Sequence, residues 1–245
     1  MDRRFLKQAV DKAQRAQRNF DLEKQIPSED LEILIYTAQN SPSKQNESHF
    51  TLHVYTDQEI IKNIYNSTKK FTLMDEEDDL SKLFGEKNGE YWQNDKDRSV
   101  TNSQVLANAL FAYVIDLGEP RGGTHITGQN SSSVHAKQLY QEQISYSIGI
   151  SIGELILSAN LLGYKTGICS AMDGRIVKNI LQTESSVKML VGVGFDNPGV
   201  DRRMHAEIKN QDVPEKFRNG NLEEKWRFPS FDKKCKVFLN GKKYK

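Results

Sequence analysis

The chain has 245 residues, of which 37% are hydrophobic and 27% charged, and its formal net charge is +1. This is enough apolar material for a core, and the near-neutral balance argues against a nucleic-acid binder that works through bulk positive charge. No stretch approaches the ~18 uninterrupted apolar residues of a membrane span and no signal peptide is evident, so we expect a cytoplasmic protein without a membrane partner.

The first part of the chain is expected to run helix, helix, loop, strand, helix. Residues 2–19 are charged and helical in composition, and a second helix is predicted to begin with Ser28 as its N-cap. Its apolar residues recur at helical spacing: Leu31, Leu34, Ile35 and Ala38. A breaker cluster at 40–43 ends it. The alternation in Phe50–Tyr55 predicts a half-buried strand, and 57–65 returns to helical spacing.

The middle of the chain combines a polar stretch with a strongly apolar one. Residues 66–101 carry an acidic run at 75–79 and few apolar side chains, so we expect an excursion from the core. Together with the Gly- and Ser-rich loop at 118–134, this excursion is our hypothesis for a lid over a substrate. Between the two, Ala109–Ile115 is continuously apolar and is predicted to be a strand buried on both faces.

The longest periodic stretch, residues 137–162, predicts a buried helix. Its apolar positions share one broad face: Ile144, Ile148, Ile152, Leu155, Ile156, Ala159 and Leu162. Gly149 and Gly153 are four residues apart and permit close approach of another helix. Plain core packing and a dimer interface both account for this pair.

The remaining predicted elements are a strand at 165–170, a helix at 174–181, a strand at 187–194 and an isolated strand at 236–239. An isolated strand needs a sheet edge, in its own subunit or in a partner. Strands that alternate with helices indicate an α/β or α+β sandwich. Because no internal repeat is visible, we expect one domain over residues 1–245, with a carboxy-terminal extension at 210–245.

Several catalytic classes lack their signatures. The sequence has no glycine-rich dinucleotide or nucleotide triphosphate loop and no Gly-x-Ser-x-Gly nucleophile motif. Cys169 and Cys235 are the two cysteines, and they are too far apart in the chain to suggest a zinc site. We therefore expect neither a metal site nor hydrolase chemistry.

Four short motifs follow one another along the chain. The first, at residues 15–20, is Arg-Ala-Gln-Arg-Asn-Phe. It is similar to the Arg-Ser-x-Arg/Lys-x-Phe signature of the nitroreductase family. Residues 41–50 resemble its Pro-Ser-x-x-Asn-x-Gln-Pro-Trp loop. Residues 159–170 look like the end of its dimer helix and the turn that faces the flavin. Residues 191–195, followed by 201–203, resemble its closing strand and basic loop. Ala16 replaces the serine of the first motif, and Ser48-His49-Phe50 replaces Gln-Pro-Trp.

The resemblance implies an α+β fold: an α/β/α sandwich with a mostly antiparallel sheet, a long buried dimer helix and a carboxy-terminal strand that a homodimer can exchange. It implies an FMN-dependent enzyme that takes hydride from NADH or NADPH and reduces a small electron-poor acceptor such as a nitroaromatic or a quinone. The flavin carries the chemistry, so no catalytic side chain is required. A non-catalytic flavin-binding or sensing protein, and an interaction module without flavin, stay open as alternatives.

The resemblance also assigns residues to the flavin. Arg15 with Arg202 or Arg203 would neutralise the phosphate, since a phosphate needs converging cations. Arg18 would stabilise the reduced ring near N1 and O2, and its alternative is an intrahelical ion pair. Asn46 would meet the pyrimidine edge, and His49 is expected at the surface. The other residues expected at the flavin are Gln17, Pro42, Ser43, Lys44, Ile168, Cys169, Ser170 and Ala171. Cys169 is interpreted as a packed thiol rather than a nucleophile.

Overall fold

The structure is a computed structural model that describes residues 2–43, 46–68, 71–72, 99–100, 102–115, 134–200, 202, 237–239 and 242–244. Its helices are α1 (Arg3–Ala13), α2 (Ser28–Gln39), α3 (Gln58–Asn66), η2 (Ser103–Val105, a 3-10 turn), α7 (Val134–Leu161) and α8 (Gly174–Leu181). Its strands are β1 (Phe50–Tyr55), β2 (Phe71–Thr72), β3 (Ser99–Val100), β4 (Ala109–Ile115), β5 (Lys165–Cys169), β6 (Val187–Gly194), β7 (Val237–Leu239) and β8 (Lys242–Tyr244).

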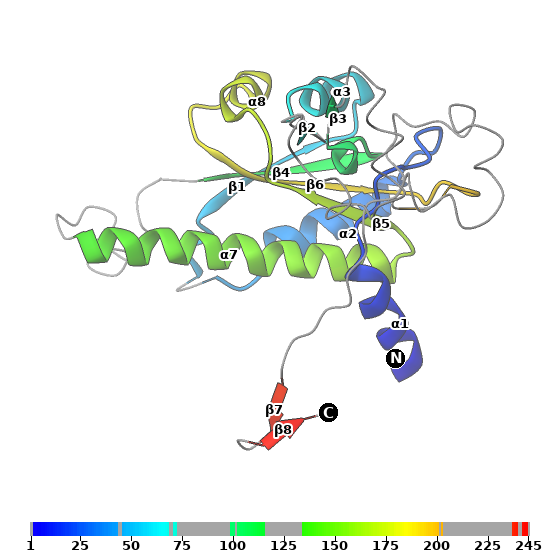
Figure 1. Ribbon diagram of the computed structural model, residues 1–245, viewed down its shortest axis with the longest axis horizontal. Helices are drawn as coiled ribbons and strands as arrows, with labels where there is room; N and C mark the ends of the chain where they lie inside the picture. The colour runs from blue at the N-terminus through cyan, green and yellow to red at the C-terminus, as the bar shows by residue number, and fades with distance from the viewer. Residues whose placement is uncertain are drawn as a thin grey trace.

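A four-stranded antiparallel sheet in the order β1-β4-β6-β5 forms the middle layer (Figure 1). Every residue of β4 is buried, as its continuous apolar sequence predicted. Because successive side chains of a strand point to opposite faces, β4 contributes to two cores. Phe111 and Tyr113 belong to one core, and Leu110 and Ala112 belong to the other.

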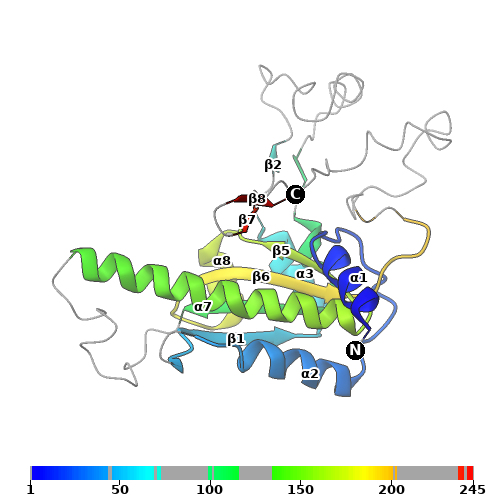
Figure 2. The same cartoon turned by 90° about the horizontal axis from the view of Figure 1, so that it is seen from below.

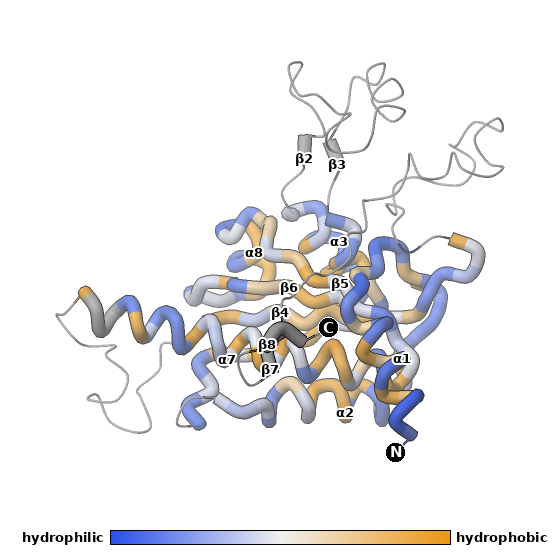
Figure 3. The backbone as a smooth tube through the Cα atoms, turned by 60° about the horizontal axis from the view of Figure 1, so that its bottom comes forward, coloured by the Kyte–Doolittle hydropathy of each residue, from blue (hydrophilic) through white to orange (hydrophobic). Residues whose placement is uncertain are grey.

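Helices α2 and α7 cover one face of the sheet, with α7 running roughly along the direction of the strands (Figures 1 and 2). Their apolar residues and those of the strands form a continuous hydrophobic layer (Figure 3). Leu34 and Leu155 are fully buried there, which confirms the two predicted stripes. Ser28 is the first residue of α2 rather than its N-cap: Pro27 takes the cap position and no side chain caps the helix.

Helices α3 and α8 cover the other face, together with η2 (Figure 1). Each of the two helices begins at an aspartate whose carboxylate accepts hydrogen bonds from the first turn. Asp57 accepts from the amides of Glu59 and Ile60, and Asp173 accepts from those of Arg175 and Ile176. Turn η2 and the residues after it lie so close to the sheet that only glycine fits beneath them. A Cβ on Gly192 would stand 2.3 Å from the Gln104 carbonyl oxygen.

Two predictions about the ends of the chain are wrong. Helix α1 ends at Ala13, and residues 16–20 are extended, with β-bridges from Ala16 to Thr166 and from Phe20 to Asp196. The strand at the carboxy-terminal end is not isolated, because β7 pairs with β8 in an antiparallel hairpin. The connecting residues are Asn-Gly, a pair that strongly favours a two-residue hairpin turn and that the sequence interpretation overlooked.

Within the described residues, one helix is long and apolar enough to cross a membrane, the Gln138–Leu161 part of α7. Its apolar side chains instead pack on the sheet in the first core. The length and composition of α7 are therefore those of a core helix. The proposed lid at 66–101 and the loop at 118–134 fall almost entirely outside the described residues.

Candidate active site

The basic motif at 15–20 lies along the outer edge of β5. The amide of Gln17 donates to the Thr166 carbonyl at 2.8 Å, and the amide of Arg18 donates to the Arg202 carbonyl at 2.9 Å. The Arg202 guanidinium returns a bond to the Ala16 carbonyl, at 3.3 Å from Nη1. Stretches from three separate parts of the sequence are therefore held together by backbone hydrogen bonds.

Two positive charges converge at this edge. Arg18 is largely buried, and its pKa is lowered to about 10, first by loss of hydration and then by the like charge of Arg202. The nearby Cys169 opposes this shift only weakly. Both causes disfavour a charged Arg18 in the protein alone, and an anion placed between the two guanidinium groups would relieve both. Because Arg18 is outside any helix, the alternative of an intrahelical ion pair is wrong.

The turn Ile168–Ala171, which comprises the last two residues of β5 and the two residues after it, lies beside these charges. Gln104 Nε2 donates to the Ile168 carbonyl at 3.3 Å, and Asn102 Nδ2 donates to the Ala171 carbonyl at 3.2 Å. Sequence reasoning missed both side chains, since each is an ordinary polar residue beside a long polar stretch. They fix the backbone of the turn, and a ring could pack against that backbone.

Cys169 is buried in the second core. Burial raises the pKa of its thiol to about 11, against smaller opposing effects of the Ala171 carbonyl contact and of Arg18. A thiol that stays protonated is a poor nucleophile. The structure therefore agrees with the interpretation of Cys169 as a packed side chain.

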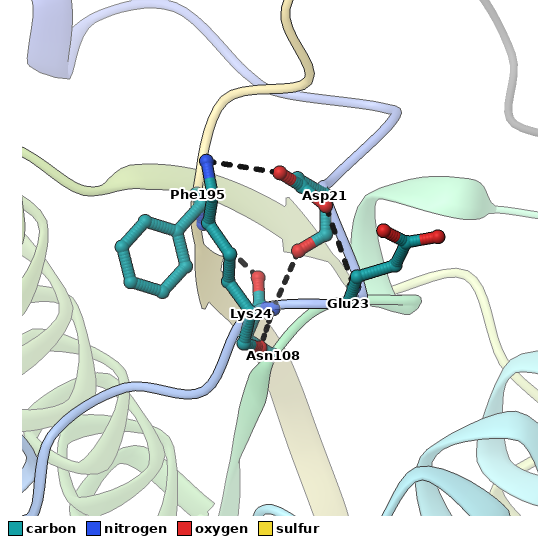
Figure 4. Close-up of polar contacts among 5 residues, drawn as sticks. All are labelled: Asp21, Glu23, Lys24, Asn108 and Phe195. Carbon is teal, nitrogen blue, oxygen red and sulfur yellow. Dashed lines mark hydrogen bonds and ion pairs between the residues drawn. The ribbon is translucent and has the colours of Figure 1, made fainter.

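Gln17 and the residues around Asn108 form a polar support behind the basic motif. Gln17 Nε2 donates to the backbone and side-chain oxygens of Asn19 and to Asp196 Oδ1, so its side chain is engaged within the protein. Asn108 Nδ2 donates to the carbonyls of Asp21 and Lys24, and its Oδ1 accepts from the Phe195 amide (Figure 4). The single amide of Asn108 thus ties the segment after the motif to the end of β6.

The loop before β1 has an unusual backbone. Asn46 and Ser48 have φ angles of 59° and 45°, in the left-handed region. Asparagine tolerates this conformation, whereas other side chains pay roughly 1–2 kcal/mol for it. Ser43 supports the turn, since its carbonyl accepts from the Asn46 amide at 3.1 Å and its Oγ from the Ser48 amide at 2.9 Å. Backbone strain of this kind is typical of binding sites.

His49 is buried, so the prediction that it lies at the surface is wrong. Its Nδ1 is 3.0 Å from Ser147 Oγ on α7, and its Nε2 is 3.1 Å from Glu47 Oε2. The ring also contacts Tyr140 edge-on, with centroids 5.7 Å apart. The alternating pattern of β1 gave no indication that His49 is buried. His49 comes just before the strand, and helix α7 covers it.

The structure brings some of the expected flavin residues together and separates others. Arg18, Arg202 and the turn Ile168–Ala171 share the β5 edge, and Arg15 is exposed beside them. Pro42, Ser43 and Asn46 precede β1, at the opposite edge of the sheet. Lys44 and Arg203 are outside the described residues.

The two groups lie towards opposite edges of the sheet. Phe50 is aligned across the sheet with Ser186, whereas Thr166 pairs with Val193, seven residues further along the chain. Three interstrand spacings and this offset place Phe50 and Thr166 on the order of 25 Å apart.

These features are those of an α+β sandwich with a basic segment along the edge of β5. Comparison with known proteins identifies the family. The model of the nitroreductase family matches residues 12–195, and the chain belongs to that family. No curated protein sequence matches the chain.

Solved structures share the fold. A BluB-like flavoprotein from Clostridium difficile 630 superposes with a TM-score of 0.55 at 16% identity, over 82% of this chain and 93% of that one. A nitroreductase family protein from Clostridium novyi NT gives 0.53 at 16%, over 83% and 90%. A nitroreductase with bound FMN from Bacteroides fragilis NCTC 9343 gives 0.52 at 14%, over 82% and 92%. The predicted α+β fold is thereby confirmed.

Proposed function

We propose that the chain is an FMN-dependent oxidoreductase that passes hydride from NADH or NADPH to a small electron-poor acceptor, such as a nitroaromatic or a quinone. The observation that carries the proposal is the convergence of Arg18 and Arg202 beside the turn Ile168–Ala171. The family membership supports it, as does the name of a similar structure, an NAD(P)H:FMN oxidoreductase from Staphylococcus epidermidis.

The residues at the β5 edge fit a flavin mononucleotide. Its phosphate would take Arg202 and Arg15, with Arg203, and its ring would lie against the backbone of Ile168–Ala171. When bound, the flavin would supply the hydride chemistry. Arg18 would hold positive charge at the pyrimidine side of the ring, where a negative charge is better tolerated beside a desolvated guanidinium than in water.

The second part of the proposal is a homodimer that completes the site. Asn46, Ser43 and Pro42 would come from the partner subunit, since they lie at the far edge of their own sheet. The side of α7 turned away from the core offers a surface for this association. Tyr146 and Ile150 are exposed there, and a Cβ on Gly149 or Gly153 would meet nothing within 4 Å. Among the described residues nothing packs on this glycine pair, which favours the interface over plain core packing.

An absorption spectrum and a turnover assay test the proposal. Purified protein should be yellow, and aerobic oxidation of NADH or NADPH with a quinone or nitroaromatic acceptor should depend on added or bound FMN. A yellow protein without turnover would favour the flavin-sensing alternative. A colourless protein that gains no flavin on reconstitution would overturn the proposal and favour an interaction module. We place the enzyme in the cytoplasm, where the reduced nicotinamides are available.

A further inference from the structure

We infer that Glu47, His49 and Ser147 form a clamp that fixes the Asn46 loop to α7, and that His49 is a positioning residue for flavin binding. The inference rests on the proposed function, because it concerns the loop that would reach the flavin of the partner subunit. His49 and its neighbour Ser48 stand where the family loop has proline and glutamine, so the clamp belongs to this chain's own sequence.

The clamp is a buried polar connection between two elements. The side chains of His49 and Glu47 are 2% and 5% exposed, and Ser147 is 1% exposed. His49 bridges them, with Nδ1 3.0 Å from Ser147 Oγ and Nε2 3.1 Å from Glu47 Oε2. Ser147 Oγ in turn donates to the Gln143 carbonyl of its own helix at 2.9 Å, which fixes its rotamer. A buried carboxylate is costly unless it is paired, so Glu47 depends on His49.

The position of the clamp explains what it does. Glu47 lies between Asn46 and Ser48, the two residues with left-handed backbone. The loop's own hydrogen bonds run from the Asn46 and Ser48 amides to Ser43, so they set its shape but do not attach it to the rest of the fold. His49 makes that attachment, to a helix in the first core. Pairing Glu47 with a side chain anchored on α7 holds the strained segment in place and sets the direction of Asn46.

A neighbouring face of α7 is the surface proposed for the dimer. Tyr146 and Ile150 are exposed there, whereas Ser147, one residue from Tyr146, is buried against the loop. One helix would therefore contact the partner subunit with one face and hold the loop offered to that partner's flavin with the face beside it. Helix α7 would thus set the position of the Asn46 loop relative to the dimer surface.

The test compares two serines on the same helix. Ser147 and Ser145 each donate to the carbonyl four residues earlier, at 2.9 and 3.0 Å, but Ser145 is exposed and is not part of the clamp. Apoprotein is titrated with FMN and the quenching of flavin fluorescence is followed. S147A should raise the Kd for FMN about tenfold, equivalent to about 1.4 kcal/mol, whereas S145A should stay within about twofold. Light scattering checks that both variants keep the wild-type oligomeric state.

A double-mutant cycle distinguishes positioning from general destabilisation. N46A removes the amide that the clamp positions, so S147A should add less than about twofold to the Kd in the N46A background. A full tenfold effect in that background would overturn the inference. H49F keeps a ring against Tyr140 but removes both nitrogen contacts, including the one to Glu47, so it should raise the Kd at least as much as S147A. Equal Kd values for H49F and wild type would also contradict the inference.

Hydrogen exchange tests the clamp without flavin. In the apoprotein, amides of the peptide that spans 43–50 should exchange at least tenfold faster in S147A and H49F than in wild type, and S145A should be unchanged. If wild-type protein binds no FMN, the proposed function fails and the exchange result alone decides the clamp. Unchanged exchange in S147A and H49F would disprove the clamp whether or not flavin binds.

Discussion

At the scale of single residues, Arg18 is a group whose surroundings favour a bound anion but lower the stability of the protein without one. A basic group whose pKa in the folded state is lowered to about 10 favours the unfolded state whenever it is charged. The penalty is complete below that pKa and disappears as the pH rises towards the ordinary pKa of an arginine side chain. At neutral pH the penalty is therefore present in full, unless an anion offsets it.

Arg18→Met should remove this penalty and keep most of the aliphatic packing. We expect the free energy of unfolding of the apoprotein, measured with urea at pH 7, to stay constant or rise by about 1 kcal/mol. The Kd for FMN should rise at least tenfold. Arg15→Met is the control for stability, because Arg15 is exposed. A less stable apoprotein with intact flavin affinity would show that Arg18 has a structural role instead.

Cys169 provides a second prediction at this scale. Because burial raises the pKa of its thiol to about 11, alkylation by iodoacetamide at pH 8 should be at least tenfold slower in the folded protein than in urea. The rate should climb with a midpoint near pH 11. Cys169→Ala should preserve turnover. Fast alkylation at pH 7 that also abolishes turnover would show a reactive cysteine.

At the scale of elements, the sequence predicts most of the core and less of its surroundings. Strands β1 and β6 and helix α8 have the predicted bounds, because alternation, continuous apolar runs and aspartate caps are local signals. The end of α1 was misjudged since residues 16–18 form hydrogen bonds with Thr166 and Arg202, which are distant in the sequence. Tertiary contacts of this kind override a helical composition.

The candidate site was predictable only as a set of residue types. Motif order indicated Arg18, Arg202 and the turn after β5, and the structure places them together. Motif order could not indicate that Asn46 lies at the other edge of the sheet, because the order of strands does not follow from a local sequence pattern. Nor could it reveal that His49 is covered by α7 or that Asn102 and Gln104 hold the turn, since both depend on packing between distant segments.

The close approach of η2 and the residues after it to the sheet makes Gly192 sensitive to any side chain. Gly192→Ala would put a Cβ 2.3 Å from the Gln104 carbonyl oxygen and 2.9 Å from the Ala107 Cβ. We expect a loss of about 2 kcal/mol or more in urea unfolding. Gly174→Ala is a matched control, because a Cβ there meets nothing within 4 Å at the start of α8. Equal stability of both variants would show that the segment can move away.

At the scale of the whole molecule, the two edges of the sheet argue for association of two chains. We expect wild-type protein to be a dimer by light scattering, and we retain residues 1–245 as one domain. Exchange of the carboxy-terminal strand between subunits stays a prediction. The β7–β8 hairpin belongs to a sheet separate from the four-stranded one.

The exposed side of α7 allows the dimer to be broken without damage to the fold. Gly149→Glu with Gly153→Glu introduces bulk and charge where nothing lies within 4 Å of either Cβ. The variant should be folded, monomeric and free of flavin, as judged by circular dichroism, light scattering and absorption. Asn63→Glu, on an exposed position of α3 in the opposite layer, controls for added charge. A monomer that stays yellow would refute a two-chain site.

The bridge between Ala16 and Thr166 has a consequence for solubility. Without the basic segment, β5 would present a row of open amides and carbonyls, a template on which further copies could stack. A chain trimmed to begin at Asp21 should therefore form aggregates that bind thioflavin, whereas one trimmed to begin at Lys12 should remain clear. Proteolysis in this segment would thus remove Arg15 and Arg18, which we propose for the flavin, and the barrier to aggregation in the same cut.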